Sequence, residues 1–298
     1  MQFTLTNTIG EVLQINPKTA DVLKEMGMHC LGCPSATGES IAGAARTHGM
    51  DPNLLLSKLN AIEIGEMSAE TAAEATPTGA VVQRDKKTFA IVPHIPGGLV
   101  TPDLLRKIAD VAEKYQAAAL KVTSAQRIAI VGLQKEDVNQ VWSELGMDPG
   151  AAAGLCVRSV KFCPGTTFCK RGQQDSVALG LELDQRYHGL ETPGKMKMAV
   201  AGCVNSCAEP AVRDIGVMGT SRGWNVMVGG NAGGNARLAD TIARHLDTPQ
   251  VIELVDEIVK YYKENAKLDE RIGTLIDRIG LDQFKQGIGL DAATAQSH

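Results

Sequence analysis

Two closely spaced cysteine pairs constrain the fold of this chain more than any other feature of its sequence. Cys163 and Cys169 form the first pair, and Cys203 and Cys207 form the second, each in a segment that contains Gly, Pro or Asn. Thiolates favour iron–sulfur clusters or zinc over hard cations. Structural zinc sites commonly use a tighter CxxC spacing, which neither pair has. The spacing therefore predicts an iron–sulfur cluster, and buried inert thiols are the alternative.

Length and composition set the outer limits on fold and function. A chain of 298 residues suggests two domains, and a hydrophobic content of 44% is enough to bury a core. The net charge of −4 gives no overall attraction to nucleic acid. We find no secretory signal at the start of the sequence and no apolar run of about 18 residues. The odd number of cysteines then favours metal or redox chemistry in a cytoplasmic protein that contacts neither membrane nor nucleic acid.

Residues 1–64 predict a small helical domain with a cysteine motif of its own. Cys30 and Cys33 form a CxxC just before a predicted helix. Because the dipoles at the start of a helix favour thiolate, we expect a redox dithiol there. Half of a zinc site completed by a second subunit, or two inert thiols, are the alternatives. Residues 65–86 are rich in Ala, Thr, Glu and Pro and predict a linker.

The remainder of the chain predicts mixed α and β structure. Residues 87–152 follow a β-α-β-β-α order, which is typical of a ferredoxin-like half-domain. Residues 153–298 alternate strands and helices around the cysteine pairs, and we expect a helix over about 236–245. The predicted fold class is α+β: a small all-helical N-terminal domain, a ferredoxin-like unit, and an α+β domain that binds the cofactors.

The cysteine pattern resembles the sirohaem and [4Fe-4S] signature of the sulfite and nitrite reductase family. The segments Gly202–Cys207 and Val228–Asn231 match that family as well, and the similarity runs from about Phe89 to Ile288. The resemblance implies that all four cysteines bind one [4Fe-4S] cluster and that Cys207 also bridges to the sirohaem iron. The N-terminal segment is similar to the redox-disulfide domain that is associated with hybrid-cluster proteins.

A reductase of this kind also needs fixed positive charge to hold an anion. On a strand, the period of two places Lys195 and Lys197 on one face, and the pair resembles the substrate-facing KxK motif of the family. Arg158 aligns with an arginine near the substrate. Lys121 takes the place of the first arginine in a segment that resembles the family's RxTxRQ. The resemblance therefore implies catalytic roles for these four residues.

The same segment departs from the family pattern at Ala125, where a second arginine is common, and the neighbouring Arg127 is a candidate replacement. Contacts to the sirohaem carboxylates are expected from five basic side chains and one backbone turn: Lys161, Lys170, Arg171, Arg222, Arg237, and the turn of Gly229, Gly230 and Asn231. The six histidines show no metal-ligand spacing, and we assign no function to them.

The resemblance predicts a six-electron reduction of sulfite to sulfide, with electrons that pass from an external ferredoxin-like donor through the [4Fe-4S] cluster. Nitrite reduction is the nearest alternative, because the same basic residues suit both anions. An iron–sulfur electron-transfer or sulfur-relay protein without sirohaem is the alternative from another class. Larger family members contain two copies of the repeated unit. A homodimer in which the basic residues of one subunit serve the sirohaem of its partner would restore that arrangement.

Overall fold

The fold is described from a computed structural model that divides the chain into two compact units, Met1–Pro77 and Thr78–His298. The structure describes residues 3–16, 18–25, 38–47, 51–60, 77 and 79–290. Cys30 and Cys33, the predicted redox dithiol, lie outside the described residues. Within these ranges no helix combines the length and the apolar character that crossing a bilayer requires.

The first unit is helical in its described part, as predicted. It contains helices α1 (Ile9–Ile15), α2 (Thr19–Glu25), α4 (Ile41–Thr47) and α5 (Pro52–Asn60). Thr8 caps α1 in a capping box with Glu11, so the first free N–H groups of this short helix have partners. Ile9, Val12, Leu23, Ile41, Leu55 and Leu59 come together from all four helices and form the core of the unit.

The second unit begins with a four-stranded antiparallel sheet. Its elements are β1 (Ala80–Val82), β2 (Phe89–Ile91), η1 (Pro96–Gly98), α7 (Pro102–Lys114), β3 (Ala119–Val122), β4 (Ile128–Leu133), η2 (Lys135–Asp137) and α8 (Val138–Leu145). The strand order is β1-β2-β4-β3. Strand β1 lies inside the predicted linker, and it pairs with β2 through Val81 and Ala90. The sheet therefore starts earlier in the sequence than we expected.

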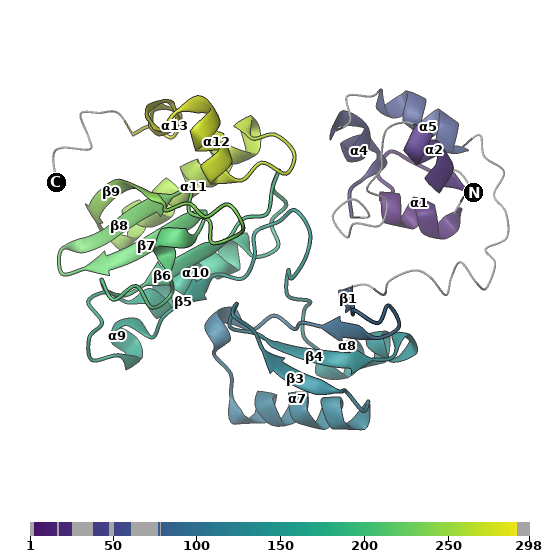
Figure 1. Cartoon of the computed structure of the whole chain (residues 1–298), viewed down its shortest axis with the longest axis horizontal. Coiled ribbons are helices and arrows are strands. Elements are labelled where there is room, and N and C mark those ends of the chain that lie inside the picture. Colours follow the sequence, from purple (N-terminus) through teal and green to yellow (C-terminus); the bar gives the residue numbers. More distant parts are fainter. Residues whose placement is uncertain are drawn as a thin grey trace. The chain divides into compact units, whose positions relative to one another are not determined.

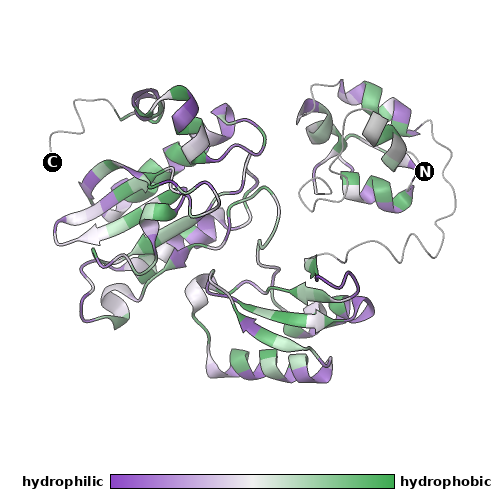
Figure 2. Ribbon diagram, in the orientation of Figure 1, coloured by the Kyte–Doolittle hydropathy of each residue, from purple (hydrophilic) through white to green (hydrophobic). Residues whose placement is uncertain are grey.

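Helix α7 shows how the sequence fixes this layer. Thr101 caps the helix by accepting from the Leu104 N–H, and Pro102 opens it. Ile108, Val111 and Ala112 are buried and belong to the same core as β2, β4 and α8. Figure 1 shows α7 running alongside the sheet, and Figure 2 shows hydrophobic and hydrophilic residues alternating along it. An amphipathic helix of this kind buries one stripe and solvates the other.

A five-stranded mixed sheet forms the second half of this unit. Its elements are β5 (Lys161–Phe162), α9 (Gly165–Phe168), α10 (Ser176–Tyr187), β6 (Met198–Ala201), η3 (Pro210–Val212), β7 (Ile215–Thr220), β8 (Gly223–Val228), β9 (Asp240–Leu246), α11 (Thr248–Asn265), α12 (Ile272–Ile279) and α13 (Leu281–Gly287). The strands follow the order β5-β6-β7-β8-β9. Strands β5 to β7 run parallel, and β8 and β9 run antiparallel.

The predicted helix over 236–245 is wrong, because this segment contains strand β9. It pairs antiparallel with β8, with Val226 opposite Ala243 and Trp224 opposite Leu246. Local composition suggested a helix, since Ala, Leu and Arg are good helix formers. The open edge of β8 offers backbone partners and burial for Ile242, which is 4% exposed. Pairing with the sheet therefore overrides a weak local preference.

Candidate active site

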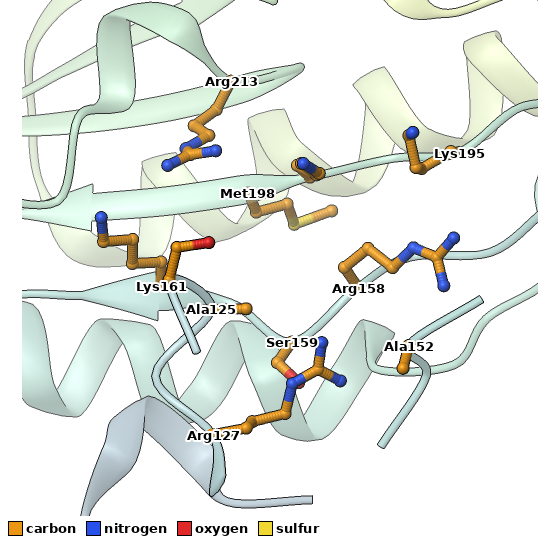
Figure 3. A pocket seen from close by; sticks show the side chains of 11 residues that line it. Ala125, Arg127, Ala152, Arg158, Ser159, Lys161, Lys195, Met198 and Arg213 are labelled. Atoms are coloured by element: carbon orange, nitrogen blue, oxygen red, sulfur yellow. The ribbon is translucent and has the colours of Figure 1, made fainter. Parts of the chain in front are cut away.

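The second unit contains a cavity of about 220 Å³ with a strongly basic lining. Six of the residues that line it are cationic: Arg127, Arg158, Lys161, Lys195, Lys197 and Arg213. Ser124, Ala125, Ala152, Ser159 and Met198 complete the lining, and none of them is acidic. Figure 3 shows the basic side chains arranged around this space from several segments of the chain. A cavity of this size and charge suits a small oxyanion.

Strand β6 and the residues before it place two of these cations. Met196, Met198 and Val200 point into the hydrophobic core. The period of two then puts Lys195, Lys197, Ala199 and Ala201 on the opposite face. Because Met196 and Met198 are buried in the core, Lys195 and Lys197 share the opposite face, which agrees with the sequence-based expectation for these two side chains.

A buried polar network holds the backbone of Lys197. Its N–H donates to Asp214 Oδ2 at 2.7 Å. Asp214 is almost fully buried, and it pairs with Arg271 through an Nε–Oδ1 contact of 2.9 Å. Arg271 Nη1 in turn donates to Asn231 Oδ1 at 2.5 Å. Asn231, a predicted cofactor contact, is absent from the cavity lining and supports the backbone of Lys197 through Arg271 and Asp214.

Burial and neighbouring positive charge act on the Lys197 ammonium. Partial burial lowers its pKa from the ordinary lysine value, and the charges of Lys195, Arg213 and Arg271 lower that pKa further. The buried Asp214 carboxyl has a raised pKa because of its desolvation, which the hydrogen bond from Arg271 opposes. A bound anion would relieve the repulsion among the lysines and arginines, because it supplies the negative charge that the cavity lining lacks.

Arg158 and Arg127 are the most buried cations in the cavity. Arg158 is 9% exposed, and it donates to the carbonyl oxygens of Ala151 and Gly154 at 2.7 and 2.9 Å. Arg127 is 6% exposed, and its Nε and Nη1 have no hydrogen-bond partner among the described residues. Burial lowers the pKa of both groups. Arg127 therefore presents an unpaired, desolvated positive charge to the cavity.

Glu209 links the cavity to the second cysteine pair. Lys161 Nζ lies 3.1 Å from Glu209 Oε2, and Arg213 Nη2 lies 2.6 Å from the same oxygen. These bonds lower the pKa of the Glu209 carboxyl, with the bond from Lys161 as the largest cause. Glu209 follows Cys207 by two positions, and Lys161 precedes Cys163 by two. The basic cavity and the cysteine loops therefore adjoin one another.

The fold brings the two cysteine loops side by side. Strands β5 and β6 pair in parallel, so the segments that follow them leave the sheet together. The Gly202 N–H donates to Cys163 Sγ at 3.0 Å, and the Cys163 N–H donates to Val200 O at 3.1 Å. Gln173 and Gln174, beyond Cys169, both donate their N–H groups to Gly202 O. The first loop is thus hydrogen-bonded to the start of the second.

Small residues make this close approach feasible. Ala199, Ala201 and Ala208 are buried together, with Cys163 packed against them. A Cβ added at Gly202 would lie 2.8 Å from the Gly165 Cα and 2.7 Å from Gln174 O. The two loops therefore meet at glycine, where no side chain separates their backbones.

The donor chemistry fits an iron–sulfur cluster beside a multiply charged anionic cofactor. Cys163, Cys169, Cys203 and Cys207 are free thiols rather than disulfides. Among the described residues, no three His, Cys, Asp or Glu side chains are placed to hold a single metal ion. Arg213 Nε and the Nε and Nη1 of Arg127 are buried hydrogen-bond donors with no acceptor among the described residues. Carboxylates of a tetrapyrrole, or an oxyanion, would supply them.

The other predicted site residues lie outside the lining of this cavity. Lys121 lies on the edge strand β3, and Lys170, Arg171 and Arg222 are exposed. Arg237 donates to Asp240 and to Asp277, and its Nη1 donates to Gly229 O at 3.1 Å, so its donors are occupied within the fold. Gly229 and Gly230 are buried against Arg237 and Arg213 respectively. Cys207, the predicted bridge to haem, is exposed.

The structure adds Arg213 to the basic residues that the sequence singled out. Arg213 follows the turn of η3 and precedes β7, and no motif marks it. The signal that could have identified it is the charged pair Arg213-Asp214 directly before the apolar start of β7. Arg127 appeared only as a substitute for the arginine that Ala125 replaces, and both of these residues line the cavity.

Comparisons with known proteins match three segments of the chain to described families. The profile described as "Nitrite and sulphite reductase 4Fe-4S domain" matches residues 153–295. The profile "Nitrite/Sulfite reductase ferredoxin-like half domain" matches residues 81–147. A domain of unknown function (DUF1858) matches residues 3–56. The two reductase profiles together cover both sheets of the second unit.

Curated relatives are similar over the same region. The "Sulfite reductase, assimilatory-type" of Nitratidesulfovibrio vulgaris is 41% identical over 212 residues, which is 71% of this chain and 97% of the relative. The "Nitrite reductase [NAD(P)H]" of Bacillus subtilis is 42% identical over 204 residues, but this chain spans only 25% of its length. The crystal structure of dissimilatory sulfite reductase I matches with a TM-score of 0.64 at 17% identity, over 71% of each chain, and shows a common fold.

Proposed function

This chain belongs to the nitrite and sulfite reductase family, and we propose on that premise that it reduces sulfite to sulfide with six electrons. Its cofactors are a [4Fe-4S] cluster and sirohaem. The observation that carries the proposal is the cavity with six cationic side chains and no acidic one, which adjoins the cysteine loops through Lys161, Glu209 and Arg213. Sulfite carries up to two negative charges, so such a cavity would concentrate it from solution.

The basic residues would hold the substrate and stabilise the charge that develops on its oxygens. Arg127 and Arg158 are buried and fixed, so they need no reorganisation when the anion enters. Lys195 and Lys197 lie just before β6 rather than on the predicted strand, but they share a face of that extended segment, and their ammonium groups can bind oxygens as these leave. Lys121, which lies away from the cavity lining, stays a predicted catalytic residue on the strength of the family resemblance alone.

The cofactors would occupy the neighbouring loops. Cys163, Cys169, Cys203 and Cys207 are the proposed cluster ligands, and Cys207 is the proposed bridge to sirohaem. Sirohaem, when bound, supplies the iron that accepts the substrate. Lys161 and Arg213 are the basic residues best placed for its carboxylates, since both line the cavity and adjoin the second loop. Lys170, Arg171, Arg222, Arg237 and the turn of Gly229, Gly230 and Asn231 stay weaker candidates, because this cavity does not include them.

We propose sulfite rather than nitrite as the substrate because the alignment covers far more of the sulfite reductase relative than of the nitrite reductase relative. This chain spans almost the whole length of the assimilatory-type sulfite reductase but about a quarter of the Bacillus nitrite reductase. Steady-state turnover on both anions, with one reduced artificial donor, tests the preference. We expect a higher kcat/KM for sulfite, with sulfide as the product. A higher kcat/KM for nitrite, with ammonia as the product, would reverse the assignment.

The electron donor is proposed to be a small acidic protein of the ferredoxin type. Lys170 and Arg171 directly follow Cys169 and are exposed, so they would attract negative charge to the cluster loop. We expect the rate with such a donor to fall as ionic strength rises, and to fall when both residues are changed to glutamate. An unchanged rate for that double variant would place the docking surface elsewhere.

Two subunit arrangements differ in whether the basic residues and the sirohaem of one site come from the same chain or from two chains. Here Arg158, Lys195 and Lys197 line one cavity with Lys161 of the same chain, whereas the composite homodimer would pair these residues with the sirohaem of the partner. A mixture of a Cys207→Ser chain and a Lys195→Ala/Lys197→Ala chain separates the two arrangements. Recovery of activity in the heterodimer supports the composite site, and no recovery supports one complete site per chain.

A further inference from the structure

A hydrogen-bonded array leads from a buried carboxylate to the wall of the basic cavity. Asp184, on α10, is 2% exposed, and its Oδ2 lies 2.8 Å from His94 Nε2. On the other side of the ring, His94 Nδ1 lies 3.4 Å from the Ser159 hydroxyl oxygen. Ser159 is itself 5% exposed and lines the cavity beside Arg127 and Arg158, as Figure 3 shows. Three polar side chains thus connect the protein interior with the anion site.

The surroundings fix the orientation of this array. Asp184 Oδ1 accepts the Val160 N–H at 2.8 Å, so both of its oxygens are engaged. The ring of His188 stacks on that of His94 with centroids 3.6 Å apart, and His188 Nε2 accepts the Ala151 N–H at 3.1 Å. Burial lowers the pKa of His188 to about 4, and the charge of His94 contributes to that shift. His188 is therefore a neutral wall near pH 7.

The polarity of the array follows from its end groups. A carboxylate can only accept, so the Nε2 of His94 carries a proton. In the neutral ring Nδ1 then accepts from the Ser159 hydroxyl, and in the protonated ring Nδ1 donates to it. The charged groups that act on the stacked His188 ring are Asp184 on α10, Arg127 before β4, and Asp148. Asp184 contacts the His94 ring directly, through the 2.8 Å approach of its Oδ2 to Nε2.

We propose that Asp184, His94 and Ser159 form a proton-delivery path into the anion cavity, an inference that rests on the proposed reductase function. Removal of an oxygen from sulfite or nitrite as water consumes protons with each electron pair. The Ser159 O–H proton would pass to an oxygen of the bound anion, while the Nδ1 proton of protonated His94 passes to Ser159 Oγ. His94 becomes neutral and keeps its Nε2 proton toward Asp184. A proton from solvent then reloads Nδ1, and no electron moves in this step.

The path through Ser159 differs from the cations of the cavity as a source of protons. Arginine does not release its proton in proteins, which excludes Arg127, Arg158 and Arg213 as proton donors. Lys197 releases its proton more readily than an ordinary lysine because its pKa is lowered, but it would then lose the charge that holds the anion. An array that begins outside the set of anion-binding groups can instead deliver protons repeatedly while all six cations keep their charge.

The test uses the full-length, cofactor-loaded protein and two variants. His94→Ala and Ser159→Ala should each lower kcat for sulfite about a hundredfold, with KM for sulfite little changed. Added imidazole should restore the His94→Ala variant, since the vacated space lies between the His188 ring, Asp184 and Ser159. Imidazole should not restore Ser159→Ala. The probe 1-methylimidazole has only one ring nitrogen free, so it cannot bridge Asp184 and Ser159 and should restore little.

The controls separate this path from a structural role and from failure of the proposed function. Ser143→Ala, at an exposed position of α8, should behave as the native protein, and the visible spectrum reports cofactor content in every variant. Native kcat in Ser159→Ala, or loss in His94→Ala that imidazole does not reverse at full cofactor content, would overturn the path. A native protein with full cofactors but no activity on either anion would instead overturn the proposed function.

Discussion

Arg127 places a positive charge where the described residues offer two of its nitrogens no partner. A buried, unpaired charge reduces stability, and proteins tolerate such groups where a ligand will meet them. The neighbouring Ala125 lines the same cavity with a side chain too short to reach an anion. Arg127, two positions further along the turn before β4, supplies a guanidinium to the same cavity.

Replacing Arg127 by methionine should therefore have opposite effects on stability and on anion binding. We expect the free energy of unfolding of the cofactor-free protein to rise by about 1 kcal/mol, because a desolvated charge is removed. Affinity for sulfite should fall roughly tenfold, because charge-assisted hydrogen bonds are lost. Urea unfolding and calorimetric titration measure the two quantities. The matched control is Arg106→Met, at an exposed position on α7, and a parallel fall of both quantities at Arg127 would contradict the argument.

The lowered pKa of Lys197 leads us to expect a pH dependence of anion binding. Burial, and then the charge of Lys195, lower its pKa. The protonated form binds the anion, so affinity should decline as pH rises through this lowered pKa, before an ordinary lysine loses its proton. Nitrite is the suitable probe, since its own charge is constant in this range. In Lys195→Met the pKa of Lys197 should rise, and the decline in affinity should move to higher pH. A decline that stays at the same pH would exclude Lys197 as its cause.

At the scale of the elements, the alternation along β6 and the three residues before it is the feature that the sequence predicts best. One face carries core residues and the other carries Lys195, Lys197 and two alanines, and the period of two requires nothing beyond local geometry. Arg213 and the array from Asp184 to Ser159 depend on segments far apart in the sequence, such as α10 and the end of β2. A local sequence pattern cannot predict which distant segments come together in the fold. The strand β9 was mistaken for a helix for the same reason, since only its partner β8 makes it a strand.

The meeting of the cysteine loops at Gly202 gives a test of the cluster site at this scale. Gly202→Ala would place a methyl group against Gly165 and Gln174 O. We expect the loops to separate, the free energy of unfolding to fall by about 1–3 kcal/mol, and iron per chain to fall. The control is Gly234→Ala, because a Cβ there meets nothing within 4 Å. Native iron content in Gly202→Ala would show that the contact between the loops is dispensable.

At the scale of the whole molecule, the chain divides into a reductase unit and a helical unit. The alignment with the assimilatory-type sulfite reductase of Nitratidesulfovibrio vulgaris covers 71% of this chain and 97% of that relative. The remainder of this chain lies outside that alignment. The predicted Cys30 and Cys33 dithiol belongs to that remainder. We propose that it modulates electron delivery rather than the chemistry of the anion site.

Removal of residues 1–77 should therefore leave cofactor content and turnover with an artificial donor close to native values. The Cys30→Ser/Cys33→Ser variant should have the same turnover as the shortened chain with the artificial donor. The turnover of either variant should differ from that of the native protein only when a protein supplies the electrons. Loss of cofactors in the shortened chain would show that the helical unit is needed to assemble the site.

The cofactor content of this chain is tested most directly by a visible spectrum of the purified protein, combined with quantification of iron, acid-labile sulfide and extractable tetrapyrrole. We expect a cluster and a sirohaem in the same chain, with four cluster irons for each tetrapyrrole, and loss of both signals in Cys207→Ser. Iron and sulfide in full amount without any extractable tetrapyrrole would contradict it and would identify the chain as an electron carrier or sulfur-relay protein.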